Sequence, residues 1–181
     1  MIERYSLPEM DAIFSDAARF ARYLEIELHA LDGQATIGVV PSSVASACRA
    51  RSPKVDEAFV REVSEREAVT NHDVAAFVDV VQQQIGGAEA AWLHHGLTSS
   101  DVVDTAWCAM LRDAAELIDA ALGELVGVLV REARRHRDTP MIGRTHGIHA
   151  EPTTFGAKVA LWALQVDRDR RRMKEIGRAH V

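Results

Sequence analysis

The sequence predicts an all-α protein, with a small N-terminal helical domain over residues 1–97 and the first long helices of an elongated helical bundle over residues 98–181. Two observations support this prediction. Apolar residues recur at helical spacing along nearly the whole chain, and no segment sustains the alternation of polar and apolar residues that marks a strand. We therefore expect no β-sheet. Hydrophobic residues make up 48% of the chain, which is sufficient for a packed core.

The N-terminal part of the chain predicts helices of ordinary length. Ser15 and Asp16 can cap a first helix, whose apolar residues lie on one face and which is expected to stop at Gly33. Three shorter helices are expected to follow, over residues 42–49, 53–67 and 73–85. A pair of glycines ends the last of them.

The longest helical pattern begins at Asp101 and continues to about Arg137. Gly123 and Gly127 are its only interruptions, and its apolar residues form one continuous stripe. Such a helix would be about 54 Å long, whereas a globule of this chain length is only about 40 Å across. The helix would extend beyond its own domain. We therefore expect an elongated bundle, in which other chains or further sequence cover the stripe.

A second long helix is expected to begin after Pro152, because proline is favoured in the first turn of a helix. Its apolar residues are spaced by three and four, close to the heptad pattern of helices that pack along one another. They are Phe155, Val159, Trp162, Val166, Met173 and Ile176. Gly177 could cap this helix, but no further turn residue follows it. We therefore expect the sequence to stop inside an element of a longer protein.

Composition excludes several classes of function. The net charge of −6 argues against nucleic acid or an anionic membrane as a partner. Two arginine-rich stretches, residues 131–137 and 168–172, are interleaved with acidic residues and are typical of solvated helix faces. Cys48 and Cys108 are isolated and lack the spacing of a metal site. We expect a cytoplasmic protein without metal or cofactor.

Three stretches carry more polar groups than the helices need. The first is TNHDV, residues 70–74. Thr70 or Asn71 can cap the helix that follows, and Asp73 suits its first turn because an acidic group complements the helix dipole. His72 is then either an ordinary first-turn residue or a donor to an anion at the positive end of the helix.

The second stretch is WLHHGLTSSDVVDTA, residues 92–106. Thr98 and Asp101 fit a capping box for the long helix, although either serine between them could also be the cap. Three adjacent hydroxyls and the free N–H groups of a helix start could alternatively bind a carboxylate or phosphate. His94 could supply a further donor.

The third stretch is MIGRTHGIHAEPTTFG, residues 141–156. Its glycines allow a tight turn, and Arg144 offers a fork of donors to a carboxylate or phosphate. Imidazoles such as those of His146 and His149 exchange protons near neutral pH. A metal site at these two histidines is poorly supported, because no cysteine or carboxylate has matching spacing. A polar elbow that merely joins two helices is the other interpretation.

Taken in order, these stretches resemble the adenylosuccinate lyase family of the fumarase/aspartase superfamily. The resembling segments are MIERYS at the start, HDVAAF at 72–77, HHGLTSSDVVDTA at 94–106 and GRTHGIHAEPTTFGAKVALW at 143–162. Argininosuccinate lyases and fumarases typically carry Asn-Asp where this chain has TSSD, and carboxymuconate cycloisomerases usually lack THGIHAEP. The resemblance extends from Met1 to the last residue.

The resemblance implies an enzyme that cleaves a C–N bond by β-elimination and releases fumarate. The implied substrates are adenylosuccinate and the succinylated aminoimidazole carboxamide ribotide of purine synthesis. Such a reaction needs a base for the Cβ proton, an acid for the leaving nitrogen and donors for the succinyl carboxylates. By resemblance His146 is the general acid. The family further implies a homotetramer, in which each active site draws on three chains.

The resemblance also implies which residues bind the substrate. They are Arg4, Tyr5, Asn71, His72, Asp73, His94, Thr98 and Ser99. Thr98 and Ser99 would hold a succinyl carboxylate, and His94 would help to hold the phosphate. Arg144 is left open, because an internal ion pair would explain it equally well.

The chain departs from the family at two places. Many members carry arginine at the position of Asn71. The family's mobile Ser-Ser-x-Met-Pro-x-Lys-x-Asn loop, which carries the serine proposed as the base, has no counterpart in these residues. We therefore expect this chain by itself to be inactive. Two alternatives stay open: a non-catalytic helical module for oligomerisation or ligand binding on the same scaffold, and a carboxymuconate cycloisomerase-like relative.

Overall fold

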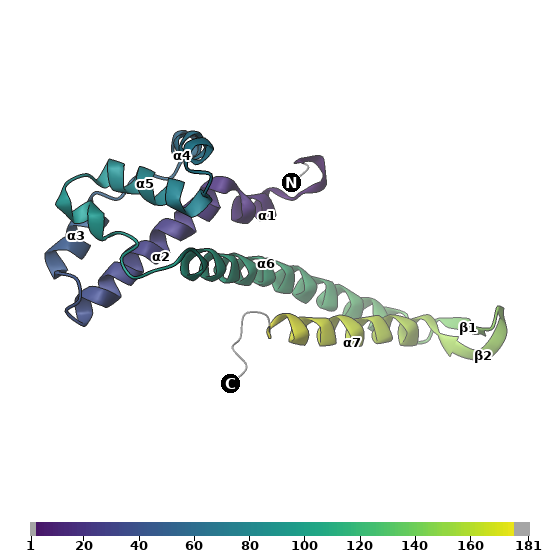
Figure 1. The fold of residues 1–181 in the computed structure, drawn as a ribbon. Coiled ribbons are helices and arrows are strands. Elements are labelled where there is room, and N and C mark those ends of the chain that lie inside the picture. Colours follow the sequence, from purple (N-terminus) through teal and green to yellow (C-terminus); the bar gives the residue numbers. More distant parts are fainter. Residues whose placement is uncertain (1–2, 176–181) are drawn as a thin grey trace. The chain divides into compact units, whose positions relative to one another are not determined.

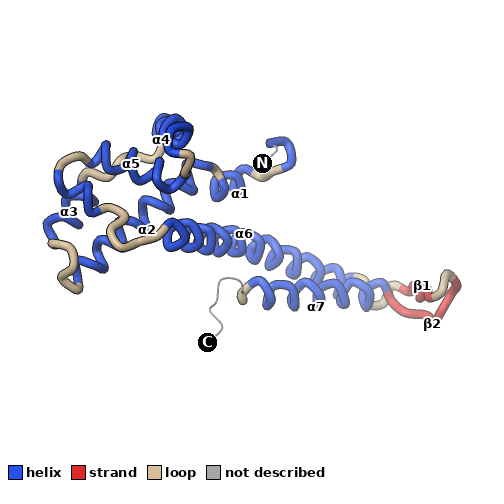
Figure 2. Tube along the Cα trace, viewed as in Figure 1, coloured by secondary structure: helices blue, strands red, loops and turns tan. Residues whose placement is uncertain are grey.

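The computed structural model describes residues 3–175, so Ile176 and Gly177 of the predicted second long helix lie outside the described residues. Within this range the chain forms seven α-helices, two 3-10 helices and one two-stranded sheet, which confirms the all-α prediction (Figures 1 and 2). Two compact units can be distinguished, Met1–Met110 and Leu111–Val181. The predicted division into domains between residues 97 and 98 stays a prediction.

The first unit consists of short and medium helices. They are η1 (Glu3–Tyr5), α1 (Pro8–Phe14), α2 (Asp16–Thr36), α3 (Ser42–Ala50), α4 (Glu57–Thr70), α5 (Asp73–Ile85), η2 (Ala88–Trp92) and the start of α6 (Ser99–Arg135). α3 and α5 confirm the predicted helices to within one residue. α1 and η2 were not predicted, because elements of seven and five residues are too short to show a periodic pattern.

The predicted end of α2 at Gly33 is wrong. Ser15 caps the helix as expected, accepting a hydrogen bond of 3.1 Å from the N–H of Ala18. The helix then continues through Gly33 to Thr36, because a glycine inside a helix costs only about 1 kcal/mol relative to alanine. Gly38 follows the end of the helix with a φ of +76°, a conformation that glycine adopts without strain.

The predicted start of α4 at residue 53 is also wrong. The helix begins at Glu57, and the side chain of Asp56 caps it by accepting hydrogen bonds from the N–H groups of Ala58 and Phe59 at 3.0 and 3.2 Å. Proline favours a first turn, but a side-chain acceptor satisfies two free N–H groups. The aspartate therefore sets the boundary.

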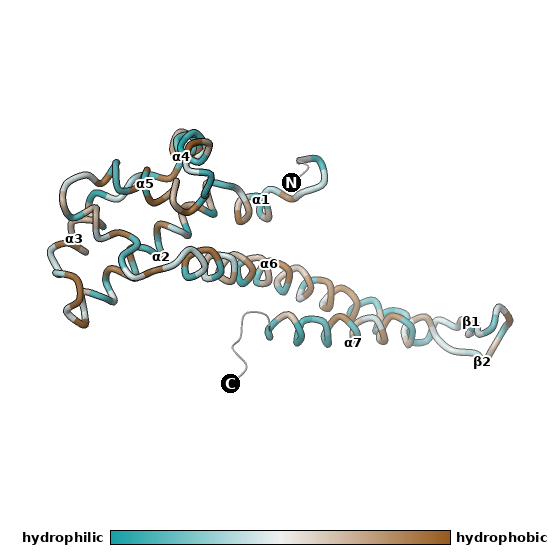
Figure 3. The backbone as a smooth tube through the Cα atoms, viewed as in Figure 1, coloured by the Kyte–Doolittle hydropathy of each residue, from teal (hydrophilic) through white to brown (hydrophobic). Residues whose placement is uncertain are grey.

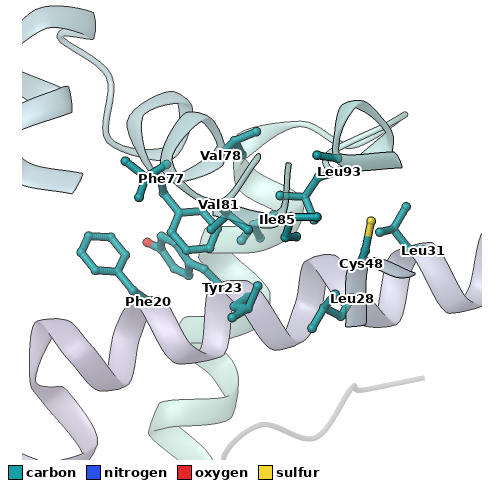
Figure 4. Close-up of a cluster of buried hydrophobic side chains, with 14 of the residues drawn as sticks. Phe20, Tyr23, Leu28, Leu31, Cys48, Phe77, Val78, Val81, Ile85 and Leu93 are labelled. Carbon is teal, nitrogen blue, oxygen red and sulfur yellow. The ribbon is translucent and has the colours of Figure 1, made fainter. Parts of the chain in front are cut away.

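An aromatic cluster forms the centre of the first unit (Figure 4). Phe77 of α5 stacks on Phe20 of α2 with ring centroids 5.7 Å apart, and it meets Tyr23 edge-on at 5.5 Å. Phe59 of α4 completes the cluster at 6.0 Å from Phe77. Offset and edge-on contacts of this kind stabilise more than the buried area alone. They fix α2, α4 and α5 against one another.

The second unit is built from two long helices joined by a hairpin. It contains the rest of α6, the strands β1 (Pro140–Thr145) and β2 (Ile148–Thr154), and α7 (Phe155–Met173). α6 has 37 residues, about 55 Å at the helical rise, which confirms the predicted long helix to within two residues at each end. α7 runs back along it (Figure 1), and Arg170 pairs with Asp119 through hydrogen bonds of 2.8 and 3.2 Å.

Apolar side chains of both long helices are exposed in the single chain. On α6 they are Trp107, Leu117, Ile118, Leu125 and Val128, and on α7 they are Leu161, Trp162 and Leu164, with exposed fractions from 38% to 66%. Figure 3 shows hydrophobic stretches along both helices. The chain itself thus leaves the predicted stripe of α6 partly uncovered.

The expectation of no sheet is wrong for one short segment. β1 and β2 form an antiparallel hairpin, but most of their side chains are exposed on both faces. Neither strand therefore needs an apolar face, and the period-two signal is missing. Pro152 lies in β2 opposite Ile142, a position that a two-stranded sheet tolerates, and α7 starts at Phe155 with Thr154 as its cap.

The contact between the start of α7 and the end of α6 should be intolerant of any added side chain. A Cβ on Gly156 would lie 2.4 Å from the carbonyl oxygen of Ala133 and 2.7 Å from that of His136. We expect Gly156→Ala to destabilise the chain by about 2–3 kcal/mol, because backbone atoms at the end of α6 or at the start of α7 must move to make room. Urea unfolding followed by circular dichroism measures this change.

The matched control is the same substitution in α2. Gly33 is helical and exposed, and an added Cβ would have no neighbour within 4 Å. Gly33→Ala should therefore stabilise the chain by about 0.5–1 kcal/mol. Equal effects of the two substitutions would contradict the packing described for Gly156.

Candidate functional site

His146 lies at the tip of the hairpin. Thr145 pairs with Ile148, so His146 and Gly147 form a two-residue loop, with φ angles of +50° and +76°. Two positive φ angles are what a type I′ turn requires. The imidazole is exposed and has no hydrogen-bond partner among the described residues. The predicted elbow is therefore a hairpin that presents an imidazole at its end.

The base of the hairpin and the first turns of α7 enclose an open groove of about 710 Å³. Its titratable lining residues are Arg144, His149 and Lys158, with no acidic residue among them. Arg144 forms no ion pair within residues 3–175, so the internal pair considered for it is not seen there. At Gly143 the strands approach closely, and a Cβ would lie 2.8 Å from the carbonyl oxygen of Glu151. Because Arg144 and Lys158 line the groove and no acidic residue does, the groove suits an anionic group.

The stretch at residues 70–74 forms the junction between α4 and α5. Asn71 ends α4 in the left-handed conformation, with a φ of +52°. His72 is therefore the first extended residue, and its Nδ1 accepts a hydrogen bond of 3.3 Å from the N–H of Ala75. The prediction that Thr70 or Asn71 caps α5 is wrong. Because Nδ1 is an acceptor, the proton of a neutral His72 ring is on Nε2.

Asp73 occupies the first turn of α5, as expected. Its carboxylate accepts a hydrogen bond of 2.8 Å from the N–H of Val74. Acidic side chains in a first turn are stabilised by the helix dipole. Asp73 is half-buried, whereas Asn71 and His72 are exposed.

The start of α6 confirms one arm of the predicted capping box. The N–H of Thr98 donates a hydrogen bond of 2.8 Å to the carboxylate of Asp101, and the helix begins at Ser99. The hydroxyls of Thr98 and Ser99 have no hydrogen-bond partner among the described residues. Capping therefore explains Asp101, and it leaves two hydroxyls for a ligand.

His94 is held by a buried carboxylate that was not predicted from the sequence. Glu27 of α2 is fully buried, and its Oε2 accepts a hydrogen bond of 2.9 Å from the N–H of His94. Its Oε1 lies 2.6 Å from Nδ1 of the same residue. Burial raises the pKa of the Glu27 carboxyl, and the hydrogen bond and charge of His94 oppose this rise. A signal was present, because Glu27 interrupts the apolar face of α2.

Arg4 and Tyr5 lie in η1 near the start of the chain. The guanidinium carbon of Arg4 is 4.9 Å from the centroid of the Tyr5 ring, a cation–π contact. Both side chains are exposed, Tyr5 to 73%. Among the described residues neither side chain has a tertiary partner, so the two form an exposed aromatic and cationic pair.

The predicted residues fall into separate groups. Asn71, His72 and Asp73 share one helix junction, and His94, Thr98 and Ser99 share the segment that leads into α6. These six belong to the first unit together with Arg4 and Tyr5, whereas His146 belongs to the second. No group of three or more histidine, cysteine or acidic residues suited to a metal occurs among residues 3–175. Over the same range, no helix combines the length and apolar character needed to cross a membrane.

The chain is similar in sequence to known lyases over its whole length. It is 44% identical over 184 residues to adenylosuccinate lyase of Deinococcus radiodurans, which covers 100% of this chain and 42% of that protein. It is 43% identical over 175 residues to adenylosuccinate lyase of Bacillus subtilis, covering 97% of this chain and 39% of that one. The chain thus spans about two fifths of the length of these relatives.

Solved structures show the same fold. Fumarate lyase from Mesorhizobium sp. BNC1 has a TM-score of 0.83 at 31% identity, covering 92% of this chain and 39% of that chain. The 3-carboxy-cis,cis-muconate lactonizing enzyme from Pseudomonas putida has a TM-score of 0.80 at 32% identity, covering 94% and 40%. A family model described as Lyase matches residues 3–181. The chain belongs to this lyase family.

Proposed function

We propose that the protein carrying this sequence is an adenylosuccinate lyase. It would release fumarate by β-elimination from adenylosuccinate, giving AMP, and from the succinylated aminoimidazole carboxamide ribotide. The identity of 42–44% with curated adenylosuccinate lyases, over 97–100% of this chain in the two described above, is the observation that carries the proposal. The muconate enzymes among the structural relatives support a cycloisomerase as the second candidate, at a lower identity of 26–32%.

The proposed reaction assigns His146 as the general acid. A base removes a proton from Cβ of the succinyl group, the C–N bond breaks, and the leaving nitrogen takes up a proton. An exposed imidazole at the tip of a two-residue turn is suited to deliver that proton into a pocket completed by other parts of the assembly. The base is assigned to a serine on a loop outside these residues.

The first unit would bind the anionic parts of the substrate. Thr98 and Ser99 offer hydroxyls at the positive end of α6, where a succinyl carboxylate would be favoured. His72 offers an N–H at the start of α5, next to Asn71 and Asp73. His94 would contact the phosphate. Arg4 and Tyr5 would contact the nucleotide as a cationic and an aromatic group.

The active enzyme is proposed to be a cytoplasmic homotetramer. The exposed apolar side chains of α6 and α7 suit a bundle shared between chains, because isolated chains rarely expose so many neighbouring apolar groups. Each active site would combine residues of three chains. The alternative, a non-catalytic helical module, predicts that the chains assemble but do not turn over substrate.

Replacing the proposed acid should remove most of the activity of the full-length enzyme. His146→Gln keeps a polar side chain but cannot supply the proton, so kcat for adenylosuccinate should fall by about 10²- to 10⁴-fold. Fumarate release, followed by absorbance, measures this. His29→Gln is the matched control, because His29 is exposed on α2 and has only a long contact of 3.9 Å with Glu25. Equal activity of both variants would contradict the assignment.

Two inactive variants should complement each other if a site combines chains. When His72→Gln and His146→Gln subunits are dissociated together and reassembled, some sites receive both intact histidines from different chains. Random assortment should restore at most about a quarter of the activity of the unmodified enzyme. Persistently inactive mixed tetramers would show that one chain supplies both histidines.

The 181-residue chain alone should release no fumarate, because the proposed base lies outside it. The full-length enzyme at the same concentration is the reference. Turnover by the isolated chain would require a base among the residues described above, and it would overturn the proposed division of roles.

A further inference from the structure

The segment between η2 and α6 is anchored to the first unit by polar side chains of α2 and α5. Gln82 donates a hydrogen bond of 3.3 Å to the carbonyl oxygen of Leu93, and Gln34 donates one of 2.7 Å to that of His95. His94 lies between these two anchors, with a φ of +65°. The backbone on both sides of His94 is therefore fixed.

Glu27 binds the residue between those anchors. It is the only buried charged residue among the described ones, and both of its oxygens contact His94, one through the backbone N–H and one through Nδ1. A buried carboxyl group is costly unless hydrogen bonds satisfy it. Since both partners belong to His94, the carboxyl group constrains the position and the rotation of that ring together.

This contact decides which atom of the ring remains available. Nδ1 is engaged by Glu27 at 2.6 Å, whereas Nε2 has no hydrogen-bond partner among residues 3–175. The side chain of His94 is 24% exposed although that of Glu27 is fully buried. The ring therefore bridges the core and the surface, with Nδ1 on the inner side.

We propose that Glu27 is a positioning residue, whose carboxyl group accepts from Nδ1–H of a doubly protonated His94, so that Nε2–H is presented to an anionic oxygen of the nucleotide substrate. The inference rests on the proposed function, in which His94 binds substrate. Carboxylates that bind one ring nitrogen of a histidine commonly fix its tautomer and its orientation. A purely structural role for Glu27 would affect the stability of the fold but not substrate binding.

The test is a double-mutant cycle in the full-length enzyme. Glu27→Gln keeps the size of the side chain but replaces one of the two accepting oxygens with an NH2 group, which would face one of the two N–H donors of His94. We expect the KM for adenylosuccinate to rise on the order of tenfold, the typical effect of losing one charge-assisted hydrogen bond, with little change in kcat. His94→Gln should raise KM similarly, and the double variant should be no worse than the more impaired single one.

Glu89→Gln is the matched control. It also converts a glutamate to glutamine in the first unit, where Glu89 pairs with Arg51 at 2.9 Å, and it should leave KM unchanged. A folded Glu27→Gln enzyme with the KM of the unmodified enzyme would overturn the inference. Multiplying effects of the two single variants would also overturn it, because the residues would then act independently.

A crystal structure of the unmodified enzyme with AMP and fumarate tests the same point if Glu27→Gln does not fold. We expect Nε2 of His94 within about 3.2 Å of an anionic ligand oxygen while Glu27 keeps Nδ1. A ring directed away from both ligands would overturn the inference. If the unmodified enzyme releases no fumarate, the proposed function fails. If it releases fumarate and the Glu27→Gln enzyme has the same KM, only the positioning role fails.

Discussion

The second unit depends on the close contact between the end of α6 and the start of α7. The N–H of Phe155 donates to the carbonyl oxygen of Thr139 at 2.9 Å, and that of Gly156 donates to His136 at 2.9 Å. These bonds close the chain into a loop between residues 139 and 155. Because Gly156 lacks a side chain, the backbones can approach closely enough to form them. The hairpin can then only extend away from the helix ends, with His146 at its tip.

The first unit holds its polar groups by a different means. His72 and Thr98 lie where helices begin, so unsatisfied N–H groups and the helix dipole determine their surroundings. His94 lies in an irregular segment and needs a tertiary anchor, which Glu27 provides from the core. Local chain geometry is thus enough to position the polar groups at the helix starts. The position of His94, in contrast, depends on a residue that is 67 positions away in the sequence.

Sequence patterns predicted those elements whose signals are local. The regular stripe of α6, the cap at Ser15 and the contact of Asp101 with the N–H of Thr98 were predicted because apolar spacing and capping chemistry act within a few residues. The hairpin was missed, since strands that are exposed on both faces have no apolar alternation. Glu27 interrupts the apolar face of α2, but its partner is distant in the sequence, so this local signal did not identify the contact with His94.

The candidate residues of each unit are mostly hydrogen-bond donors or cations. Arg144 and His146 lie on the hairpin, and the hydroxyls of Thr98 and Ser99 lie at a positive helix end. Donors stabilise carboxylates and the negative charge that builds up on them when a carbanion forms. In the proposed elimination these donors would bind the succinyl group and protonate the leaving nitrogen, and the proposed base is a separate group outside these residues. The proposal therefore keeps acid and base on different segments, which come together only when the site is complete.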